Sequence, residues 1–252
     1  MLAIERRNEI LRRLALSGKV IVSELSRDFS VSEETIRRDL EKLDAEGLAR
    51  KTYGGAVSPE KKEFDIPFNL RKSVNVEEKE KIANTLSDIV SDGDTVFLDA
   101  SSTAIFAVRK LKTKRELTVI TNSVEILLEL SDVAGWNVIS TGGLLREGTL
   151  SLTGATALKT VQNYHADIAI LSAAGLDASF GVSETTEFNA AIKQAMMDNS
   201  GKSVLVIDHT KFDRVSFARV CTAASLDAVV TDREPDRKWR ELLAENGVEI
   251  YY

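Results

Sequence analysis

The 252-residue sequence contains one cysteine, three prolines and two histidines. The lone Cys221 excludes a disulfide framework and a cysteine-based zinc site. His165 and His209 have no HxH or HxxxH partner, so we expect no metal site, and His209 is either a pocket-lining or an ordinary hydrogen-bonded histidine. Aromatic residues make up only 6% of the chain, which offers no stacking platform for single-stranded nucleic acid.

Long apolar runs are also absent. No stretch approaches the roughly 18 residues of a membrane span, and the charged run Glu5-Arg6-Arg7 is not typical of a signal peptide. The sequence has no Walker loop and no GxSxG motif, so we expect no cofactor. The 43% hydrophobic and 29% charged residues are typical of folded domains. These features predict a cytoplasmic protein with no membrane partner.

The chain lacks an excess of basic residues, since its net charge is −6. Residues 1–57 carry 11 Lys and Arg against 10 Asp and Glu, or +1, which leaves −7 for the remainder. Affinity for DNA grows with the number of phosphates that are neutralised, so one copy of this segment would bind DNA weakly. A DNA-binding role therefore predicts a homo-oligomer, a dimer or tetramer, on repeated half-sites.

Two helices joined by a tight turn are predicted near the N-terminus. They span residues 22–29 and 32–46, and Ser30-Val31 forms the turn. Ser32 is a favourable N-cap for the second helix. One stripe of that helix is apolar and is expected to face a core. This stripe consists of Ile36, Leu40 and Leu43.

The opposite face of the second helix is polar and basic. Residues 48–53, followed by Gly54-Gly55, predict a short β-wing after it. An apolar back with an Arg and Thr front suits a helix that enters the DNA major groove. The alternative is an ordinary helix pair with a solvated charged face, and the added wing favours the DNA reader. The predicted DNA-binding residues are Ser32, Glu34, Thr35, Arg37, Arg38, Lys42, Arg50, Lys51 and Tyr53.

The pattern divides the chain into two domains and a linker. We expect a DNA-binding domain at 1–57, a linker at 58–74 and an effector and oligomerisation domain at 75–252. The linker begins with Ser58–Glu63, which is charge-dense and contains a proline. Three residues are expected to anchor it to the second domain: Phe64, Pro67 and Phe68.

Residues 75–252 alternate between helix and strand. Short continuous apolar runs predict strands that are covered on both faces. The expected fold is therefore an α/β, mostly parallel, doubly wound (Rossmann-like) sheet that binds ligands at the carboxyl ends of its strands. The strands are expected at 95–98, 117–120, 136–139, 168–171, 204–207, 228–230 and 248–251. The helices are expected at 77–90, 103–111, 123–130, 186–199 and 236–245.

The loop after the first of these strands is a candidate anion site. Residues 99–103 (Asp-Ala-Ser-Ser-Thr) bring hydroxyl and backbone N–H groups to a helix N-terminus, which suits a phosphate. The alternative is simple helix capping by Ser or Thr. Several polar segments at one sheet edge favour a polar ligand over capping alone. The other such segments are Thr121-Asn122-Ser123, Thr141-Gly142-Gly143 and Asp208-His209-Thr210-Lys211.

The motifs of both domains resemble those of DeoR-type transcriptional regulators. In the first domain the resemblance rests chiefly on the Thr-Ile-Arg-Arg-Asp-Leu run of residues 35–40 and on Tyr-Gly-Gly-Ala at 53–56. The second domain resembles the DeoR-type effector domain, which is similar in fold to ribose-5-phosphate isomerase and related sugar-phosphate enzymes. Its matches include Asn75, Glu78-Lys79, Leu98-Asp99, Gly142-Gly143, Arg146, Gly175-Leu176-Asp177, Lys193 and Lys211-Phe212.

This resemblance implies a sequence-specific regulator of a carbohydrate-metabolism operon, by the usual mode a repressor. It further implies binding to double-stranded operator DNA under the control of a phosphorylated sugar. The residues expected to bind this effector are Lys79, Asp99, Ala100, Ser101, Ser102, Thr103, Asn122, Gly142, Gly143, Arg146, Asp177, Glu184, Lys193 and Lys211.

Two positions depart from the family pattern. Ser101 stands where the family commonly has glycine, and Asn189 stands where an acidic residue is common. An alternative function is a sugar-phosphate isomerase-like enzyme with an appended DNA-binding head, whose base would be one of the carboxylates near the pocket. Because carboxylates are common in any chain and a whole winged helix is specific, we expect a regulator with no catalytic residues.

Overall fold

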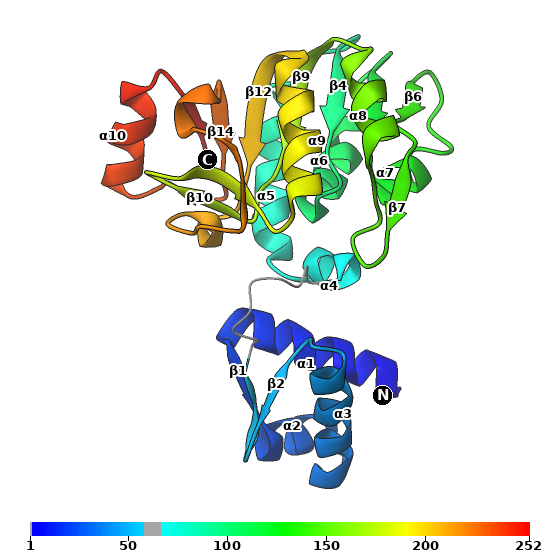
Figure 1. Cartoon of the computed structure of the whole chain (residues 1–252), viewed down its shortest axis with the longest axis vertical. Coiled ribbons are helices and arrows are strands. Elements are labelled where there is room, and N and C mark those ends of the chain that lie inside the picture. Colours follow the sequence, from blue (N-terminus) through cyan, green and yellow to red (C-terminus); the bar gives the residue numbers. More distant parts are fainter. Residues whose placement is uncertain (1, 58–66) are drawn as a thin grey trace. The chain divides into compact units, whose positions relative to one another are not determined.

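The computed structural model describes residues 2–57 and 67–252. The chain forms two compact units, Met1–Val74 and Asn75–Tyr252 (Figure 1). The expected linker residues Ser58–Glu63 and Phe64 lie outside the described part. Among the described residues, none of the helices combines the length and apolar character needed to cross a membrane.

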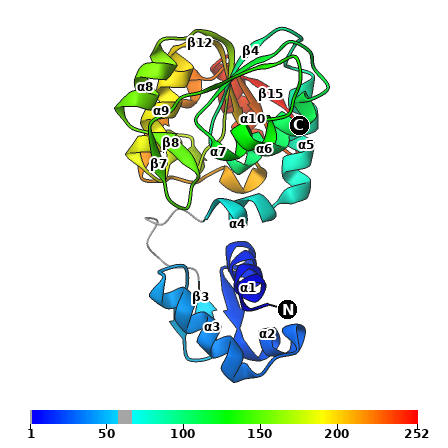
Figure 2. The ribbon, with the colours of Figure 1, turned by 90° about the vertical axis from the view of Figure 1, so that its right-hand side faces the viewer.

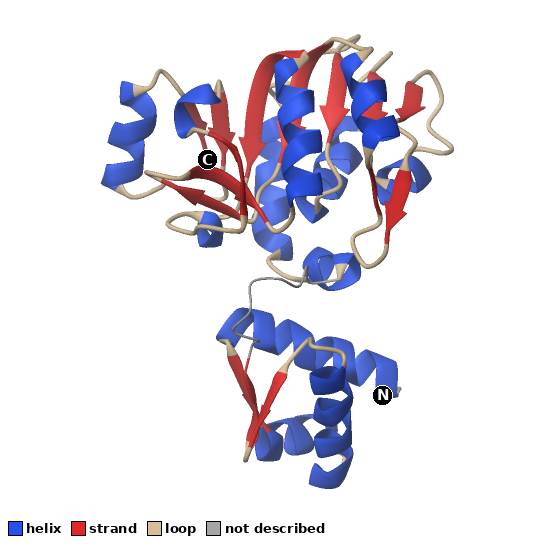
Figure 3. Ribbon diagram, in the orientation of Figure 1, coloured by secondary structure: helices blue, strands red, loops and turns tan. Residues whose placement is uncertain are grey.

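The N-terminal unit is a winged helix-turn-helix (Figure 3). Its three strands pair antiparallel in the order β1-β3-β2. Gly55 lies so close to the first strand that a Cβ atom there would be 1.9 Å from the Val20 carbonyl oxygen, so only glycine fits. The elements are α1 (Ala3–Ser17), β1 (Lys19–Ile21), α2 (Val22–Phe29), α3 (Glu33–Ala45), β2 (Arg50–Thr52), β3 (Gly55–Val57) and α4 (Phe68–Ser73).

The predicted helix pair is present with its turn and cap. Ser30 has a left-handed backbone (φ 54°) between α2 and α3, and Ser32 Oγ accepts a hydrogen bond from the Thr35 N–H at 3.2 Å. Helix α4 lies within the segment expected to be a linker, and its Leu70 belongs to the apolar core of the N-terminal unit. The other buried members of this core include Ile10, Leu14, Leu25, Ile36, Leu40 and Leu43.

The C-terminal unit has a seven-stranded parallel sheet with the order β15-β14-β12-β9-β4-β5-β6. Helices α5, α6 and α7 cover one face and α8 and α9 the other, which confirms the doubly wound α/β fold (Figure 2). The strands are β4 (Thr95–Leu98), β5 (Thr118–Thr121), β6 (Asn137–Ser140), β9 (Ala166–Leu171), β12 (Ser200–Val206), β14 (Ala228–Val230) and β15 (Glu249–Tyr251). The helices are α5 (Val76–Ser87), α6 (Ser102–Leu111), α7 (Val124–Glu129), α8 (Ala155–Gln162), α9 (Glu187–Asp198) and α10 (Arg237–Glu245).

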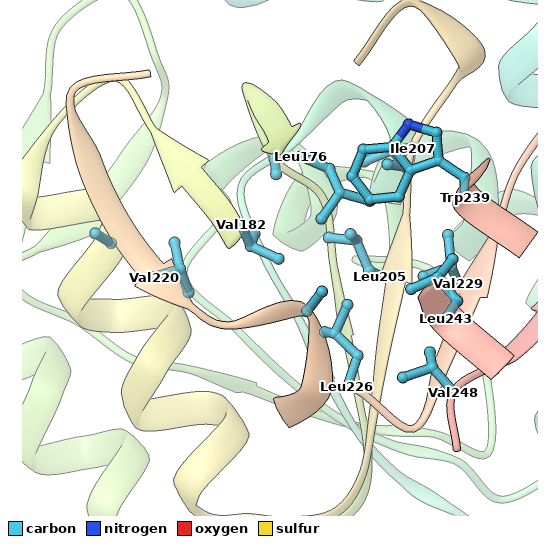
Figure 4. Packing of buried hydrophobic residues seen from close by; sticks show 13 residues of the cluster. Leu176, Val182, Leu205, Ile207, Val220, Leu226, Val229, Trp239, Leu243 and Val248 are labelled. Atoms are coloured by element: carbon cyan, nitrogen blue, oxygen red, sulfur yellow. The ribbon is translucent and has the colours of Figure 1, made fainter. Parts of the chain in front are cut away.

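Several short elements were not predicted from the sequence. A β7–β8 hairpin and helix α8 precede β9, and an antiparallel sheet of order β10-β11-β13 packs beside the main one. In Figure 4, Leu176 and Val182 of this small sheet point toward Leu205, Val229 and the Trp239 ring, so one apolar core joins them. The remaining elements are β7 (Leu144–Arg146), β8 (Ser151–Thr153), β10 (Gly175–Asp177), β11 (Gly181–Glu184), β13 (Ala218–Cys221) and the 3₁₀ helices η1 (His209–Lys211) and η2 (Ala223–Ser225).

The strand order reverses direction between β4 and β9. From β4 the chain proceeds to β5 and β6 on one side, and from β9 to β12, β14 and β15 on the other. In doubly wound sheets, ligands bind at the carboxyl ends of the strands beside such a switch point. The sheet topology therefore directs attention to the residues that follow β4 and β9.

Candidate functional site

A buried ammonium group lies beside this switch point. Lys193 of α9 has its Nζ 2.6 Å from Asp99 Oδ2 and 2.5 Å from Glu184 Oε1, and it donates to the Ser172 carbonyl oxygen at 2.5 Å. All four residues are buried. The Lys193 group thus joins the ends of β4 and β9, strand β11 and helix α9.

The three contacts determine the charge and the role of Lys193. Burial by itself lowers the pKa of the ammonium, but the Asp99 and Glu184 carboxylates outweigh it, so the pKa of Lys193 is raised and the group is charged at neutral pH. An ammonium has three N–H donors, and three acceptors of the protein surround it. Lys193 was predicted as an effector ligand. Its three N–H donors instead face Asp99, Glu184 and the Ser172 carbonyl, so we assign it the role of holding these groups in position.

Asp99 is held by protein donors as well. Its Oδ1 accepts from the Ser101 N–H at 3.1 Å, and its Oδ2 accepts from the Ser172 N–H at 2.8 Å as well as from Lys193. The carboxylate consequently fixes the loop that leads into α6. Ser101 then caps this helix, because its Oγ accepts from the Ala104 N–H at 3.0 Å, and its φ of −91° needs no glycine.

The predicted anion loop therefore leads into a capped helix, and Ser101 needs no glycine-specific backbone conformation there. Ala100 is half-buried, and Ser102 and Thr103 are buried in the first turn of α6. The first turn of a helix has N–H groups without intrahelical partners, and the helix dipole favours an anion there.

Asn122 follows β5 at the same edge of the sheet. Strands β4 and β5 pair with Leu98 opposite Thr121, so Asp99 and Asn122 leave the sheet at neighbouring positions. Asn122 is 1% exposed, and its Nδ2 donates to the Leu152 carbonyl oxygen at 3.1 Å. No described residue donates a hydrogen bond to its Oδ1. A buried acceptor without a donor is costly, which calls for a partner from outside the chain, a ligand or a water.

A second unsatisfied group comes from the β7–β8 hairpin. Arg146 pairs with Ser151 across the hairpin, and Ser151 forms a β-bridge with Ser123, the residue after Asn122. The Arg146 guanidinium carbon lies 3.9 Å from the centroid of the Phe188 ring on α9. Its Nε is buried, and none of the described residues accepts a hydrogen bond from it. The site region thus contains two buried polar atoms without a partner among the described residues, the acceptor Asn122 Oδ1 and the donor Arg146 Nε.

The two glycines before this hairpin have a backbone role. Gly142 and Gly143 have φ values of 61° and 107°, in the left-handed region that favours glycine. A Cβ atom on Gly143 would be 2.5 Å from the Thr153 carbonyl oxygen. Gly143 therefore allows the backbone just before β7 to pack closely against β8.

The remaining predicted effector residues are not among the three partners of Lys193 described above. Asp177 Oδ1 accepts from the N–H groups of Ser179 and Phe180 at 2.9 and 2.8 Å, which closes the β10–β11 turn and lowers the pKa of Asp177. Lys79 is buried on α5, and Lys211 is half-buried in η1. The other departure, Asn189, lies in the first turn of α9, where its N–H donates to Thr186 Oγ1 at 3.2 Å.

The N-terminal unit presents a second candidate site, a nucleic-acid interface on α3 and the wing. The Arg38 side chain is 77% exposed, and its Nε lies 3.4 Å from Glu34 Oε1. Two further basic side chains form short ion pairs. Arg37 Nη2 is 2.6 Å from Glu33 Oε2, and Lys51 Nζ is 2.5 Å from Glu41 Oε1. Ser32, Lys42, Arg50 and Tyr53 are exposed and Thr35 is half-buried.

Sequence reasoning missed Asp39 in the middle of this helix. Asp39 is buried, and its Oδ2 is 2.5 Å from Arg6 Nε, while its Oδ1 is 3.6 Å from Arg7 Nη1. It therefore ties α3 to α1. In the sequence, burial of Asp39 could have been predicted from its position three residues after Ile36, at the border of the apolar stripe.

Comparison with known families identifies both units. The DeoR-like helix-turn-helix domain matches residues 6–62, and the DeoR C terminal sensor domain matches residues 74–233. The chain belongs to the DeoR family of transcriptional regulators. The predicted resemblance is thereby confirmed in both units.

Curated relatives of similar length support the assignment. The chain is 38% identical to the Uncharacterized HTH-type transcriptional regulator YulB of Bacillus subtilis, over 99% of this chain and 96% of that protein. It is 30% identical to the Glycerol-3-phosphate regulon repressor of Escherichia coli, over 98% of this chain and 97% of that protein. Both are named as regulators, which favours regulation over the isomerase-like alternative.

Among solved structures, ribose 5-phosphate isomerase A from Methanocaldococcus jannaschii is similar over 55% of each chain, at 17% identity and a TM-score of 0.41.

Proposed function

We propose that this DeoR-family regulator is a repressor of a carbohydrate-metabolism operon and acts in the cytoplasm. Helix α3 and the wing contact double-stranded operator DNA, and a homo-oligomer, a dimer or tetramer, supplies the required number of contacts. A phosphorylated sugar bound in the C-terminal unit controls the affinity for DNA. The name of the E. coli relative includes glycerol-3-phosphate, a small phosphorylated polyol, which supports an effector that carries a phosphate and hydroxyl groups.

The observation that carries the effector proposal is the buried Oδ1 of Asn122, for which no described residue is a donor. A sugar hydroxyl would donate to this oxygen. The phosphate would then lie at the first turn of α6, near the hydroxyls of Ser102 and Thr103, with Arg146 Nε as a charge-assisted donor. A ligand that carries both an anionic group and hydroxyl groups would offer a partner to each of these unpartnered atoms.

Control of DNA binding requires that the sugar phosphate binds one conformation of the protein more tightly than another. A coupling free energy of about 1–3 kcal/mol, or roughly 5–150-fold in DNA affinity, is the usual range. Arg146 is a candidate to transmit such a change, because its guanidinium stacks on Phe188 and so connects the β7–β8 hairpin to α9.

The test begins with selection of a duplex from a random-sequence pool by the full-length protein. Fluorescence anisotropy then measures its affinity for the selected duplex with a panel of sugar phosphates and with the same sugars unphosphorylated. We expect at least one phosphorylated sugar to weaken DNA binding within the range above, and its unphosphorylated form to have no effect. Sedimentation of the same samples gives the oligomeric state.

Variants separate the two halves of the proposal. Asn122→Ala and Arg146→Ala should keep the DNA affinity of the wild type and lose the response to the sugar phosphate. The matched controls are Asn246→Ala and Arg237→Ala, whose side chains are exposed in the same unit and should leave the response intact. Failure to select any duplex contradicts the DNA-binding half. A response that survives in Asn122→Ala and Arg146→Ala contradicts the location of the effector.

A further inference from the structure

Three potential metal ligands meet at the carboxyl ends of β12 and β14. Glu78 lies in the first turn of α5, His209 begins η1 after β12, and Asp232 follows β14. Each offers one ligand atom, and these three atoms lie within 4.8 Å of one another. The residues come from three distant segments of the sequence, so the local histidine spacing that argued against a metal site does not apply to them.

The cluster is partly fixed before any ion arrives. Strands β12 and β14 are parallel, with Val206 opposite Val230, so His209 and Asp232 leave the sheet on neighbouring strands. Asp232 Oδ1 accepts from the His209 N–H at 2.6 Å, and Asp232 Oδ2 lies 2.9 Å from His209 Nδ1. The backbone hydrogen bond holds the Asp232 carboxylate in place before any ion is bound. A metal ion that binds both Nδ1 and Oδ2 would take the place of the contact between these two atoms.

Access and charge both suit a cation. The side chain of Asp232 is 4% exposed and that of His209 is 33% exposed, so the cluster is anchored on one side and open on the other. Two carboxylates this close repel each other, and a cation between them lowers that energy. One imidazole with two carboxylates is a donor set for first-row divalent transition metals, whereas magnesium prefers oxygen ligands alone.

We propose that Glu78, His209 and Asp232 bind one first-row divalent transition-metal ion, such as Zn²⁺ or Mn²⁺. The three protein ligands leave coordination positions for water. The ion ties the first turn of α5 to the ends of β12 and β14, and α5 is the first helix of the C-terminal unit.

Arg233 is a competing source of positive charge beside this cluster, with its Nε 3.6 Å from Asp232 Oδ2. Cys221 and His165, the other cysteine or histidine side chains of the chain, do not belong to the cluster. Burial raises the pKa of the Cys221 thiol to about 12, so this thiol stays protonated at neutral pH. His165, the second histidine of the chain, is exposed and serves as the matched control.

The experiment uses the full-length protein, free of any affinity tag and stripped of metal with a chelator. Isothermal titration calorimetry with Zn²⁺, Mn²⁺ and Mg²⁺ is carried out on the wild type and on the variants His209→Gln, Glu78→Gln and His165→Gln. Circular dichroism verifies that each variant is folded. We expect one Zn²⁺ or Mn²⁺ per chain in the wild type and in His165→Gln, and binding at least about tenfold weaker in the other two.

Two results would overturn the proposal. One is the absence of saturable Zn²⁺ and Mn²⁺ binding in the wild type. The other is wild-type affinity in either Glu78→Gln or His209→Gln. If His209→Gln fails to fold, Glu78→Gln decides the matter, because this side chain is only half-buried. The titration uses neither DNA nor sugar, so its outcome is independent of the function proposed above.

Discussion

The Lys193 ammonium lies 2.6 Å from the Asp99 carboxylate and joins α9 to the carboxyl end of β4. Glu184 is the second carboxylate on the same ammonium, at 2.5 Å. One buried cation therefore compensates two buried anions at the switch point of the sheet. Loss of the cation would leave both carboxylates without a counter-charge in a region closed to water.

Lys193→Met should lower the free energy of unfolding of the C-terminal unit by about 3–5 kcal/mol, the usual cost of breaking a buried ion pair. Urea denaturation followed by tryptophan fluorescence measures this, because Trp136 and Trp239, the two tryptophans of the chain, both lie in this unit. The matched control is Lys202→Met, whose exposed Nζ is 3.3 Å from Glu249 Oε2 and which should cost less than about 1 kcal/mol. Equal losses in both variants would contradict the role given to Lys193.

Asp208 predicts a distinct dependence of stability on pH. Burial by itself raises the pKa of this carboxyl, but the charge of Lys211 and hydrogen bonds from Thr210 and Asn75 outweigh it and hold the pKa below its ordinary 3.8. A carboxyl with a lowered pKa stabilises the fold above its unfolded pKa, and this contribution is lost as the pH falls through the folded value.

The stability difference between wild type and Asp208→Asn should therefore be constant at about pH 5–7 and shrink below the ordinary pKa of 3.8. Urea titrations at a series of pH values measure it. The control is Asp132→Asn at an exposed position, which should stay within about 0.5 kcal/mol of the wild type. A difference for Asp208→Asn that grows toward acid pH would be inconsistent with the lowered pKa.

The sequence predicted the main sheet because its strands are continuous apolar runs. Residues 95–98 and 228–230 were expected as strands and match β4 and β14 in full. The strands of the small antiparallel sheet escaped prediction because their three or four residues mix polar and apolar side chains, so they form no continuous apolar run like those of β4 and β14. The wing was found despite equally short strands, because it follows a complete helix-turn-helix.

The polar residues of the candidate site were predicted better than their contacts. Residue types and strand ends indicated Asp99, Asn122 and Lys193, but not that Asp99 and Lys193 bind each other across 94 positions of the sequence. Such a contact depends on the pairing of β4 with β9. Likewise, only the structure reveals that Asp177 closes its own turn.

Asp39→Ala should loosen the N-terminal unit. Its removal leaves Arg6 buried without its 2.5 Å partner, at a cost of about 3–5 kcal/mol. Hydrogen exchange of the full-length protein should then show faster exchange in α1 and α3, with α9 unchanged. Glu34→Ala is the control, because its pairing with Arg38 is exposed and its loss should leave exchange in both helices nearly unaltered. Unchanged protection of α1 in Asp39→Ala would contradict the proposed tie.

Arg38→Ala should weaken binding to the selected duplex by about 1–3 kcal/mol and leave the fold intact. Arg38 is 77% exposed on α3 and its pair with Glu34 is 3.4 Å long, so its guanidinium is free to reach a base edge at little cost. Arg237 of α10 is the control, since it is equally exposed and also has a carboxylate one helical turn away. Anisotropy titrations should show wild-type affinity for Arg237→Ala. If Arg38→Ala binds as tightly as the wild type, α3 does not read the operator through this residue.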